Sequence, residues 1–328
     1  MPTSTPMSLL GLELTAERPP IVRVGTVDDP AGWVDLNRPA LRAVVLEYGA
    51  ALVRGLGLSE PAGVDAVFRR LGGDLMTERE AFAVRQSYAE GVYSSPAWPP
   101  NQPMCMHHEL SYRTEVPGLM LFACLTPPAT GGATALADAP TVLDALPPGL
   151  VARFEREGWL LTRSYHGDVG ASVADAFGTG DVGAVERYCR ANQIEVEWLP
   201  DGGLRTRQRR PAVVQHPVTG ARCWFNQVAF LSERTMDPEI RDYLVDVYGA
   251  ERLPFTTSFG NGDPIGADVV RLLNDVYDAY TVREPWRAGD LLLVDNIRTA
   301  HSREAYDGSR EVRVAMADPT NNAMGTDR

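Results

Sequence analysis

The sequence predicts a mainly β protein with flanking helices, built as one β-sandwich or jelly roll. Short apolar runs, bounded by glycine and proline, recur through the middle and the end of the 328 residues. Amphipathic patterns of helical period lie before these runs and between them. No internal repeat and no clear interdomain linker is visible, so all these elements are expected to share one core.

The first part of the chain predicts two helices around a strand. Residues 35–58 carry apolar side chains at helical spacing and then become strand-like, with glycines ending the strand. Residues 59–73 predict a second amphipathic helix. Ser59 is its expected N-cap, and Pro61 lies in its first turn.

Strand patterns dominate the rest of the chain. Proline-rich residues 93–103 predict a loop that leads into a strand at 104–112. Residues 160–210 mix glycines with a short helix and predict an excursion from the main sheet. The remaining pattern predicts strands at 118–128, 129–140, 194–200, 203–217 and 222–230, helices at 141–158, 237–249 and 266–281, and two strands joined by a polar loop at 289–318.

Composition excludes several classes of function. The net charge of −12 makes the chain a poor nucleic-acid binder, because phosphate contacts require a basic surface, and no basic amphipathic stretch suits an anionic membrane. All 31 basic side chains are arginine, which removes chemistry through a lysine Schiff base. The four cysteines show no CxxC spacing, and the N-terminus resembles neither a signal peptide nor a membrane span. We therefore expect a cytoplasmic protein with reduced thiols.

The segment MCMHHELSY, residues 104–112, holds two of the five histidines of the chain beside a carboxylate. It does not fit a zinc-protease helix, because HExxH needs a second histidine where Tyr112 stands. In a strand, alternation places His107 and Glu109 on one face and His108 on the other. A strand can therefore aim an imidazole and a carboxylate at one point.

A further ligand is expected from elsewhere in the chain. His166 and His216 lie in loop-like contexts, whereas His301 follows an apolar strand. Two histidines and a carboxylate on a rigid β scaffold form the facial triad of non-haem iron oxygenases, which leaves three metal positions open. Alternatively, His107 is a packed core histidine and Glu109 a surface carboxylate, as in a non-catalytic jelly-roll ligand-binding protein. A zinc hydrolase that uses the same three residues is a third alternative.

One arginine follows the candidate ligands closely in the sequence. Arg310 begins the last predicted strand, shortly after His301. An arginine there can clamp a carboxylate bidentately, as a keto-acid co-substrate requires. The alternative is a solvated arginine at the end of a strand.

Several motifs, taken in order, carry a family resemblance. They are HHELSY, PGLMLFACLTPPATGGATALADAPTVLDALP, CWFNQVAF, FGNGDPI and EPWRAGDLLLVDNIRTAHSREAYDGSREVRVAMA. As a set they resemble the taurine dioxygenase (TauD/TfdA-like) family of Fe(II)/2-oxoglutarate dioxygenases. Within it, the likeness is to the branch of clavaminate synthase and the syringomycin-type amino-acid hydroxylases. It covers roughly residues 40–318.

The resemblance implies a double-stranded β-helix core that uses Fe(II), with 2-oxoglutarate and O2 as co-substrates. It assigns His107, Glu109 and His301 as the iron ligands. Arg310 matches the arginine that grips the distal carboxylate of 2-oxoglutarate. Thr134 matches a threonine that hydrogen-bonds the co-substrate, with an ordinary β-branched strand residue as the alternative.

Other residues fall at family positions around the site. Asn226 matches an asparagine near the site, with a structural role as the alternative. Asp295 and Asn296 precede the distal histidine and either brace it or shape the turn. His108 stands where relatives carry asparagine or threonine. It either reaches the rim of the pocket, where it would touch substrate, or packs in the core.

The resemblance also implies one catalytic domain over residues 1–328, with a helical and strand N-terminal part at about 1–90, a jelly-roll core at about 91–318 and a lid-like insertion at about 160–210. The expected reaction is hydroxylation of an unactivated C–H bond in specialised metabolism, such as antibiotic biosynthesis, with release of succinate and CO2. The implied substrate is an amino acid, a peptide or an aminoacyl group tethered to a carrier protein. Desaturation, epoxidation and cyclisation remain open. Chlorination is disfavoured, because related halogenases have a small residue where Glu109 stands.

Overall fold

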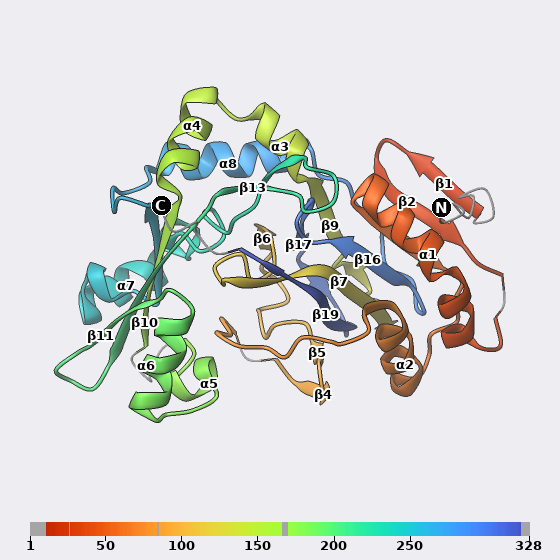
Figure 1. The fold of residues 1–328 in the computed structure, drawn as a ribbon, viewed down its shortest axis with the longest axis horizontal. Helices are drawn as coiled ribbons and strands as arrows, with labels where there is room; N and C mark the ends of the chain where they lie inside the picture. Colours follow the sequence, from red (N-terminus) through yellow and green to blue (C-terminus); the bar gives the residue numbers. More distant parts are fainter. Residues whose placement is uncertain (1–10, 26, 84, 166–169, 323–328) are drawn as a thin grey trace.

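The computed structural model describes residues 11–25, 27–83, 85–165 and 170–322 (Figure 1). Its largest sheet has the strand order β1-β2-β3-β16-β7-β19-β5-β4 and is antiparallel except for the β2–β3 pair. These strands are β1 (Gly11–Thr15), β2 (Arg18–Arg23), β3 (Ala50–Arg54), β4 (Ser87–Ala89), β5 (Val92–Ser94), β7 (Glu115–Thr126), β16 (Leu291–Asp295) and β19 (Glu311–Asn321).

A smaller sheet faces the large one across the main core. Its strands, in the order β6-β17-β9, are β6 (Met104–His107), β17 (Thr299–Arg303) and β9 (Thr134–Asp138). Side chains alternate between the two faces of a strand, so Phe122 of β7 packs in the same core as Leu136 and Ala300 of the small sheet. Its neighbour Leu121 points the other way, into a second core. The two facing sheets form the jelly roll that the sequence predicts.

The second core lies between the large sheet and two helices, α1 (Pro30–Tyr48) and α2 (Pro61–Gly72), on the right in Figure 1. Val44 of α1 and Phe68 of α2 are fully buried there. Because helices cover one face and the small sheet covers the other, the central strands are apolar on both faces, which explains their continuous apolar sequence.

The boundaries of these helices follow from local chemistry. The Asp29 side chain accepts a hydrogen bond from Gly32 N at 3.0 Å and caps α1, and Gly49 ends the helix with φ of 82°. The prediction that Ser59 caps the second helix is wrong by one position. Glu60 is the N-cap residue and makes no side-chain capping bond, because the helix begins directly at a proline whose fixed φ already suits the first turn.

The excursion predicted at residues 160–210 forms most of a separate sheet with two helices, at the lower left in Figure 1. The sheet has the order β11-β12-β10-β15 and consists of β10 (Trp159–Tyr165), β11 (Glu195–Trp198), β12 (Leu204–Arg210) and β15 (Phe255–Phe259), with α5 (Val173–Phe177) and α6 (Val182–Ala191) beside it.

The other elements are two short strand pairs and several helices. The strand pairs are β8 (Thr130–Gly131) with β18 (Tyr306–Asp307) and β13 (Val213–Gln215) with β14 (Arg222–Trp224). The helices are α3 (Ala139–Ala145), α4 (Pro148–Glu157), α7 (Pro238–Tyr248) and α8 (Ala267–Ala279), with the short 3-10 helices η2 (Glu233–Thr235) and η3 (Ala250–Arg252).

Several strand predictions need correction. The segments 129–140 and 203–217 each contain two strands, the strand at 222–230 ends at Trp224, and two further corrections concern the site. The segment 289–318 contains three main strands rather than two, because a turn after β16 breaks its apolar run. Asp295 Oδ1 accepts hydrogen bonds from the backbone N–H groups of Ile297 and Arg298, both at 3.0 Å, and this turn carries the chain from the large sheet to the small one. The strand predicted at 104–112 ends at His107, and a turn follows in which Leu110 has φ of 54°.

Among the helices that the structure describes, none has the length and apolar character needed to cross a membrane.

Candidate metal centre and its pockets

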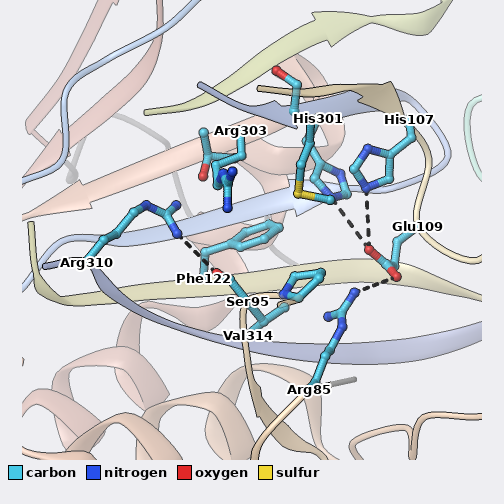
Figure 2. A pocket seen from close by; sticks show the side chains of 13 residues that line it. Arg85, Ser95, His107, Glu109, Phe122, His301, Arg303, Arg310 and Val314 are labelled. Carbon is cyan, nitrogen blue, oxygen red and sulfur yellow. Dashed lines mark hydrogen bonds and ion pairs between the residues drawn. The ribbon is translucent and has the colours of Figure 1, made fainter. Parts of the chain in front are cut away.

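A cavity between the two facing sheets collects most of the predicted site residues (Figure 2). The predicted residues that line it are His107, Glu109, Thr134, His301 and Arg310. The predicted residues that do not line it are His108, Asn226 and Asp295. The site is thus built mainly on β6, β9 and β17 of the small sheet, with β7 and β19 of the large sheet as the opposite wall.

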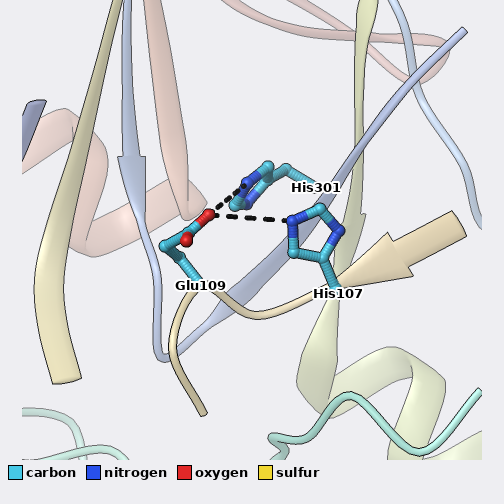
Figure 3. Close-up of side chains that lie close together, drawn as sticks. All are labelled: His107, Glu109 and His301. Atoms are coloured by element: carbon cyan, nitrogen blue, oxygen red, sulfur yellow. Dashed lines mark ion pairs between the residues drawn. The ribbon is translucent and has the colours of Figure 1, made fainter. Parts of the chain in front are cut away.

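The three predicted metal ligands converge, although they lie far apart in the chain (Figure 3). His107 and His301 are register partners on the antiparallel strands β6 and β17, which holds their rings side by side at a centroid distance of 4.4 Å. Glu109 reaches the same point from the turn after β6. Its Oε2 lies 3.7 Å from Nε2 of each histidine. The candidate ligand atoms all lie within 4.8 Å of one another.

Each of the two imidazoles can offer a nitrogen lone pair at this point. His107 Nδ1 lies 2.9 Å from the carbonyl oxygen of Cys105, so Nδ1 carries the proton and donates it, and Nε2 is left bare. Burial, and then the neighbouring His107, lower the pKa of His301 to about 4, so this ring is neutral at pH 7. Neutral imidazole is the form that binds metal ions.

The two oxygens of Glu109 have different partners. Oε2 faces the histidines, whereas Oε1 accepts a hydrogen bond from Arg85 Nη2 at 2.9 Å. Burial raises the pKa of Glu109, but Arg85 and the two histidines outweigh burial and hold this pKa well below its usual range. The carboxylate is therefore ionised, and one oxygen is directed at the metal position.

Asn296 fixes the backbone of this ligand. Its Oδ1 accepts a hydrogen bond from Glu109 N at 2.7 Å, and its Nδ2 donates to Glu109 O at 3.0 Å and to Pro117 O at 2.9 Å. Asn296 is fully buried and lies in the turn that leads to His301. It thereby ties the two ligand-bearing segments together.

The remaining predicted residues have structural partners. Of the two roles expected for Asp295, the structure shows turn-shaping, and its Oδ2 lies 2.8 Å from His216 Nε2 rather than on His301. Asn226 donates to Ala212 O at 3.1 Å and accepts from a backbone N–H group. His108 is fully buried with its Nδ1 2.6 Å from Asn296 O, so it packs in the core and does not reach the pocket. His166 lies outside the described residues.

The far end of the cavity fits an anion. Arg310 donates from Nε to Gly132 O at 3.0 Å and from Nη1 to Ser95 Oγ at 3.1 Å, and no carboxylate among the described residues pairs with it. Burial, followed by repulsion from Arg303, lowers the pKa of Arg310 to about 10. Arg303 also lines the cavity and donates only to main-chain carbonyls among its described partners. Two partly desolvated guanidinium groups without carboxylate partners suit a ligand that brings its own carboxylates.

A second and larger cavity, of about 330 Å³, adjoins two of the three ligands, His107 and Glu109. Arg85, His107 and Glu109 line both cavities, so the metal position lies at their junction. The walls of the larger cavity come largely from residues 78–112, from η2 and α7, and from the start of β15. A substrate in this cavity would therefore lie next to the metal position.

Three residues that line these cavities, Arg85, Arg303 and Glu78, were not among the predicted site residues. Arg303 stands two residues after His301 on the same strand, so strand alternation could have placed it on the same face. Arg85 and Glu78 lie in an irregular stretch before β4, where no periodicity applies. Only the folded chain brings them to the ligands.

The fold and this donor set define a class, the jelly-roll proteins that bind a divalent transition metal through two histidines and a carboxylate. Residues 15–316 match the family described as "Taurine catabolism dioxygenase TauD, TfdA family". The chain belongs to this family and is a 2-oxoglutarate-dependent non-haem iron dioxygenase. The resemblance expected from the motifs is thereby confirmed, as is the fold class.

Known relatives share most of the chain. The dapdiamide synthesis protein DdaC of Enterobacter agglomerans is 33% identical over 276 residues, which are 84% of this chain and 84% of that protein. A clavaminate synthase-like protein of Arabidopsis thaliana is 27% identical over 290 residues, 84% of this chain and 83% of that protein. In fold, the chain is similar to PvcB, an Fe, alpha-ketoglutarate dependent oxygenase from an isonitrile synthetic pathway, with a TM-score of 0.52 and 16% identity over 94% of this chain and 90% of that one. These relatives include proteins of natural-product biosynthesis.

Proposed function

We propose that the protein hydroxylates an unactivated C–H bond of an amino acid, a peptide or a carrier-bound aminoacyl group in specialised metabolism. The observation that carries this proposal is the convergence of His107, Glu109 and His301 at the junction of an anion-binding pocket and a larger cavity. Amino-acid-like substrates are supported by the name of DdaC, a dapdiamide synthesis protein, and the alternative outcomes of desaturation, epoxidation and cyclisation use the same site.

In this proposal each part of the site has a distinct task. His107, Glu109 and His301 hold Fe(II), and Arg310 binds the distal carboxylate of 2-oxoglutarate, with Thr134 beside it. Iron and 2-oxoglutarate, when bound, supply the oxidising power, and succinate and CO2 are released. The protein orients the two co-substrates and keeps water from the reacting C–H bond.

The segment at residues 160–210 is proposed to act as a lid over the substrate cavity. Its sheet partner β15 contributes Phe255 to the cavity wall, and Gly170 lines the cavity directly. A cytoplasmic location is supported by the four cysteines, which form no disulfide.

The test is turnover with purified protein, Fe(II), 2-oxoglutarate and O2 over a panel of amino acids, peptides and aminoacyl thioesters. We expect succinate formation coupled to the gain of one oxygen atom in one substrate class. His107→Ala and His301→Ala should abolish both, whereas Tyr280→Ala, at an exposed residue outside both cavities, should retain them. Absence of succinate over the whole panel, together with unchanged iron binding by His107→Ala, would overturn the proposal.

A further inference from the structure

Glu78 is a partly desolvated carboxylate in the wall of the 330 Å³ cavity that the proposed reaction leaves without a role. Its side chain is 13% exposed, and its Oε1 lies 3.0 Å from Arg85 Nε. Burial raises the pKa of Glu78, since the charged form has lost most of its hydration. Within the described part of the chain, its Oε2 has no hydrogen-bond donor.

The nearby cation is already shared between two carboxylates. Arg85 contacts Glu78 through Nε and Glu109 through Nη2, and its side chain is only 6% exposed. One guanidinium therefore faces two carboxylates, and because the other oxygen of Glu109 is directed at the metal cation, Glu78 is the anionic group that this end of the cavity offers to a ligand. Such an end attracts a cation and offers a substrate carboxylate no free partner among the described lining residues.

The rest of the cavity is largely apolar and rich in aromatic rings, with Gln102, Gln227, Thr235 and Asp237 as its other polar side chains. The apolar and aromatic side chains include those of Phe82, Trp98, Phe230, Met236, Leu244 and Phe255. Their surface suits an apolar body, and aromatic faces tolerate a neighbouring ammonium group. The cavity thus combines one anionic point near the metal position with apolar walls around it.

We propose that Glu78 binds the ammonium group of the substrate, and that the substrate class is an amine on an apolar body with no free carboxylate at the amine end. The inference rests on the proposed function, because it places the substrate in the cavity beside the metal ligands. Only the Arg85 guanidinium separates Glu78 from Glu109. An ammonium held by Glu78 therefore keeps the apolar body of the substrate in the cavity that His107 and Glu109 also line.

Asp237 is the other carboxylate of this cavity outside the metal ligands, among the described residues, and it is the weaker candidate. It is exposed, and its Oδ1 accepts hydrogen bonds from the first turn of α7, at Glu239 N (2.9 Å) and Ile240 N (3.3 Å). Water screens an exposed carboxylate, so a pair formed there discriminates little between charged and neutral ligands. Asp237 therefore provides a matched control.

The test compares three probes of one shape and different charge, namely 2-phenylethylamine, 2-phenylethanol and 3-phenylpropanoate. Each is titrated at pH 7 into the full-length protein loaded with Co(II) and 2-oxoglutarate, and binding is followed by calorimetry and by the Co(II) absorption spectrum. The ammonium probe should bind roughly tenfold or more tightly than the alcohol, the range for a desolvated charge-assisted hydrogen bond, and the carboxylate should bind most weakly. Glu78→Gln should remove this preference, Glu78→Asp should retain part of it, and Asp237→Asn should leave it intact.

Several results would overturn the inference. They are equal binding of the amine and the alcohol, tightest binding of the carboxylate, no binding of any probe, or a cation preference that survives Glu78→Gln or disappears in Asp237→Asn. Binding of Co(II) and 2-oxoglutarate is measured first for every variant, so a misfolded variant is recognised. If the wild-type protein bound neither, the proposed function would fail, whereas normal loading without a cation preference would reject the role of Glu78 alone.

Discussion

Arg85 Nη2 donates a hydrogen bond to Glu109 Oε1 at 2.9 Å, while the other oxygen of the same carboxylate faces His107 and His301. The guanidinium therefore fixes which oxygen is offered to the metal. A carboxylate that binds through one oxygen occupies one coordination position, so three positions stay open for 2-oxoglutarate and dioxygen. Arg85 itself is held from the other side by Glu78.

The first prediction concerns the replacement of this arginine. Arg85→Gln should lower the affinity for Co(II) by about 10- to 100-fold, the usual cost of removing a group that orients a metal ligand. Repulsion between Arg85 and the metal cation acts in the opposite sense, so a loss of affinity means that orientation of Glu109 outweighs repulsion. The measurement is a competition titration with a chelator, followed by Co(II) absorption.

Arg79→Gln is the matched control for this experiment. Arg79 lies on the same segment, and its Nη1 donates to the carbonyl oxygen of Phe177, away from the ligands. Its replacement should leave Co(II) affinity unchanged. If Arg85→Gln bound Co(II) as tightly as the wild type, or more tightly, the orienting role of Arg85 would be rejected.

Arg310 carries the second prediction. Arg310→Gln should weaken 2-oxoglutarate binding by about 10- to 100-fold, because a buried hydrogen-bonded charge pair contributes about 1.5–3 kcal/mol, while Co(II) affinity stays as in the wild type. Arg313→Gln is the control, since Arg313 lies three residues further along, on β19, where it pairs with Glu311 and stacks on Tyr88. Calorimetric titration of the Co(II)-loaded variants measures the affinity for 2-oxoglutarate, and titration of the metal-free variants measures the affinity for Co(II). If Arg310→Gln and Arg313→Gln lost the same amount of 2-oxoglutarate affinity, the affinity would depend on the net charge of the protein and not on a contact from Arg310.

Most of the fold follows from patterns that are local in the sequence. Helical spacing located α1 and α2, and continuous apolar runs located β7 and β16, since both faces of these central strands are buried. The break inside LLLVDNIRTAH, which the family resemblance offered as one of two roles for Asp295 and Asn296, does not follow from periodicity, because the turn that ends β16 involves only three polar or charged residues after an apolar run. Periodicity cannot show that the chain changes sheets at such a turn.

Strand geometry gave a sound reason only for the site residues that sit on regular strands. His107 and His301 were recognisable because alternation and motif spacing specify the face of a strand. Strand alternation was the reason for placing Glu109 beside His107. This reason holds only in part, because β6 ends at His107 and Glu109 lies in the following turn. Arg85 reaches the site from an irregular segment, and no local pattern encodes that long-range contact.

The third prediction concerns Asn296, the amide that holds the backbone of Glu109. Asn296→Ala removes three buried hydrogen bonds and leaves Glu109 N, Glu109 O and Pro117 O without that partner, so the free energy of unfolding should fall by about 2–4 kcal/mol. Asn296→Asp should be no milder, because a carboxylate cannot donate to the two carbonyl oxygens. Urea unfolding of the metal-free protein measures the change. Asn261→Ala, in an exposed turn, is the control and should stay within about 0.5 kcal/mol of the wild type.

The fourth prediction is a pH dependence of the metal-free protein. Burial lowers the pKa of His108 to about 3 and that of His301 to about 4, from an ordinary value of 6.5. Between pH 6.5 and 4 the unfolded chain therefore binds more protons than the folded one, so stability is present above pH 6.5 and is lost as the pH falls. Each buried histidine should contribute about 1.4 kcal/mol per pH unit to this loss. His108→Gln removes one of the two groups, so urea unfolding from pH 7 to 4.5 should show a slope smaller by about that amount, and an unchanged slope would mean that His108 takes up its proton without unfolding.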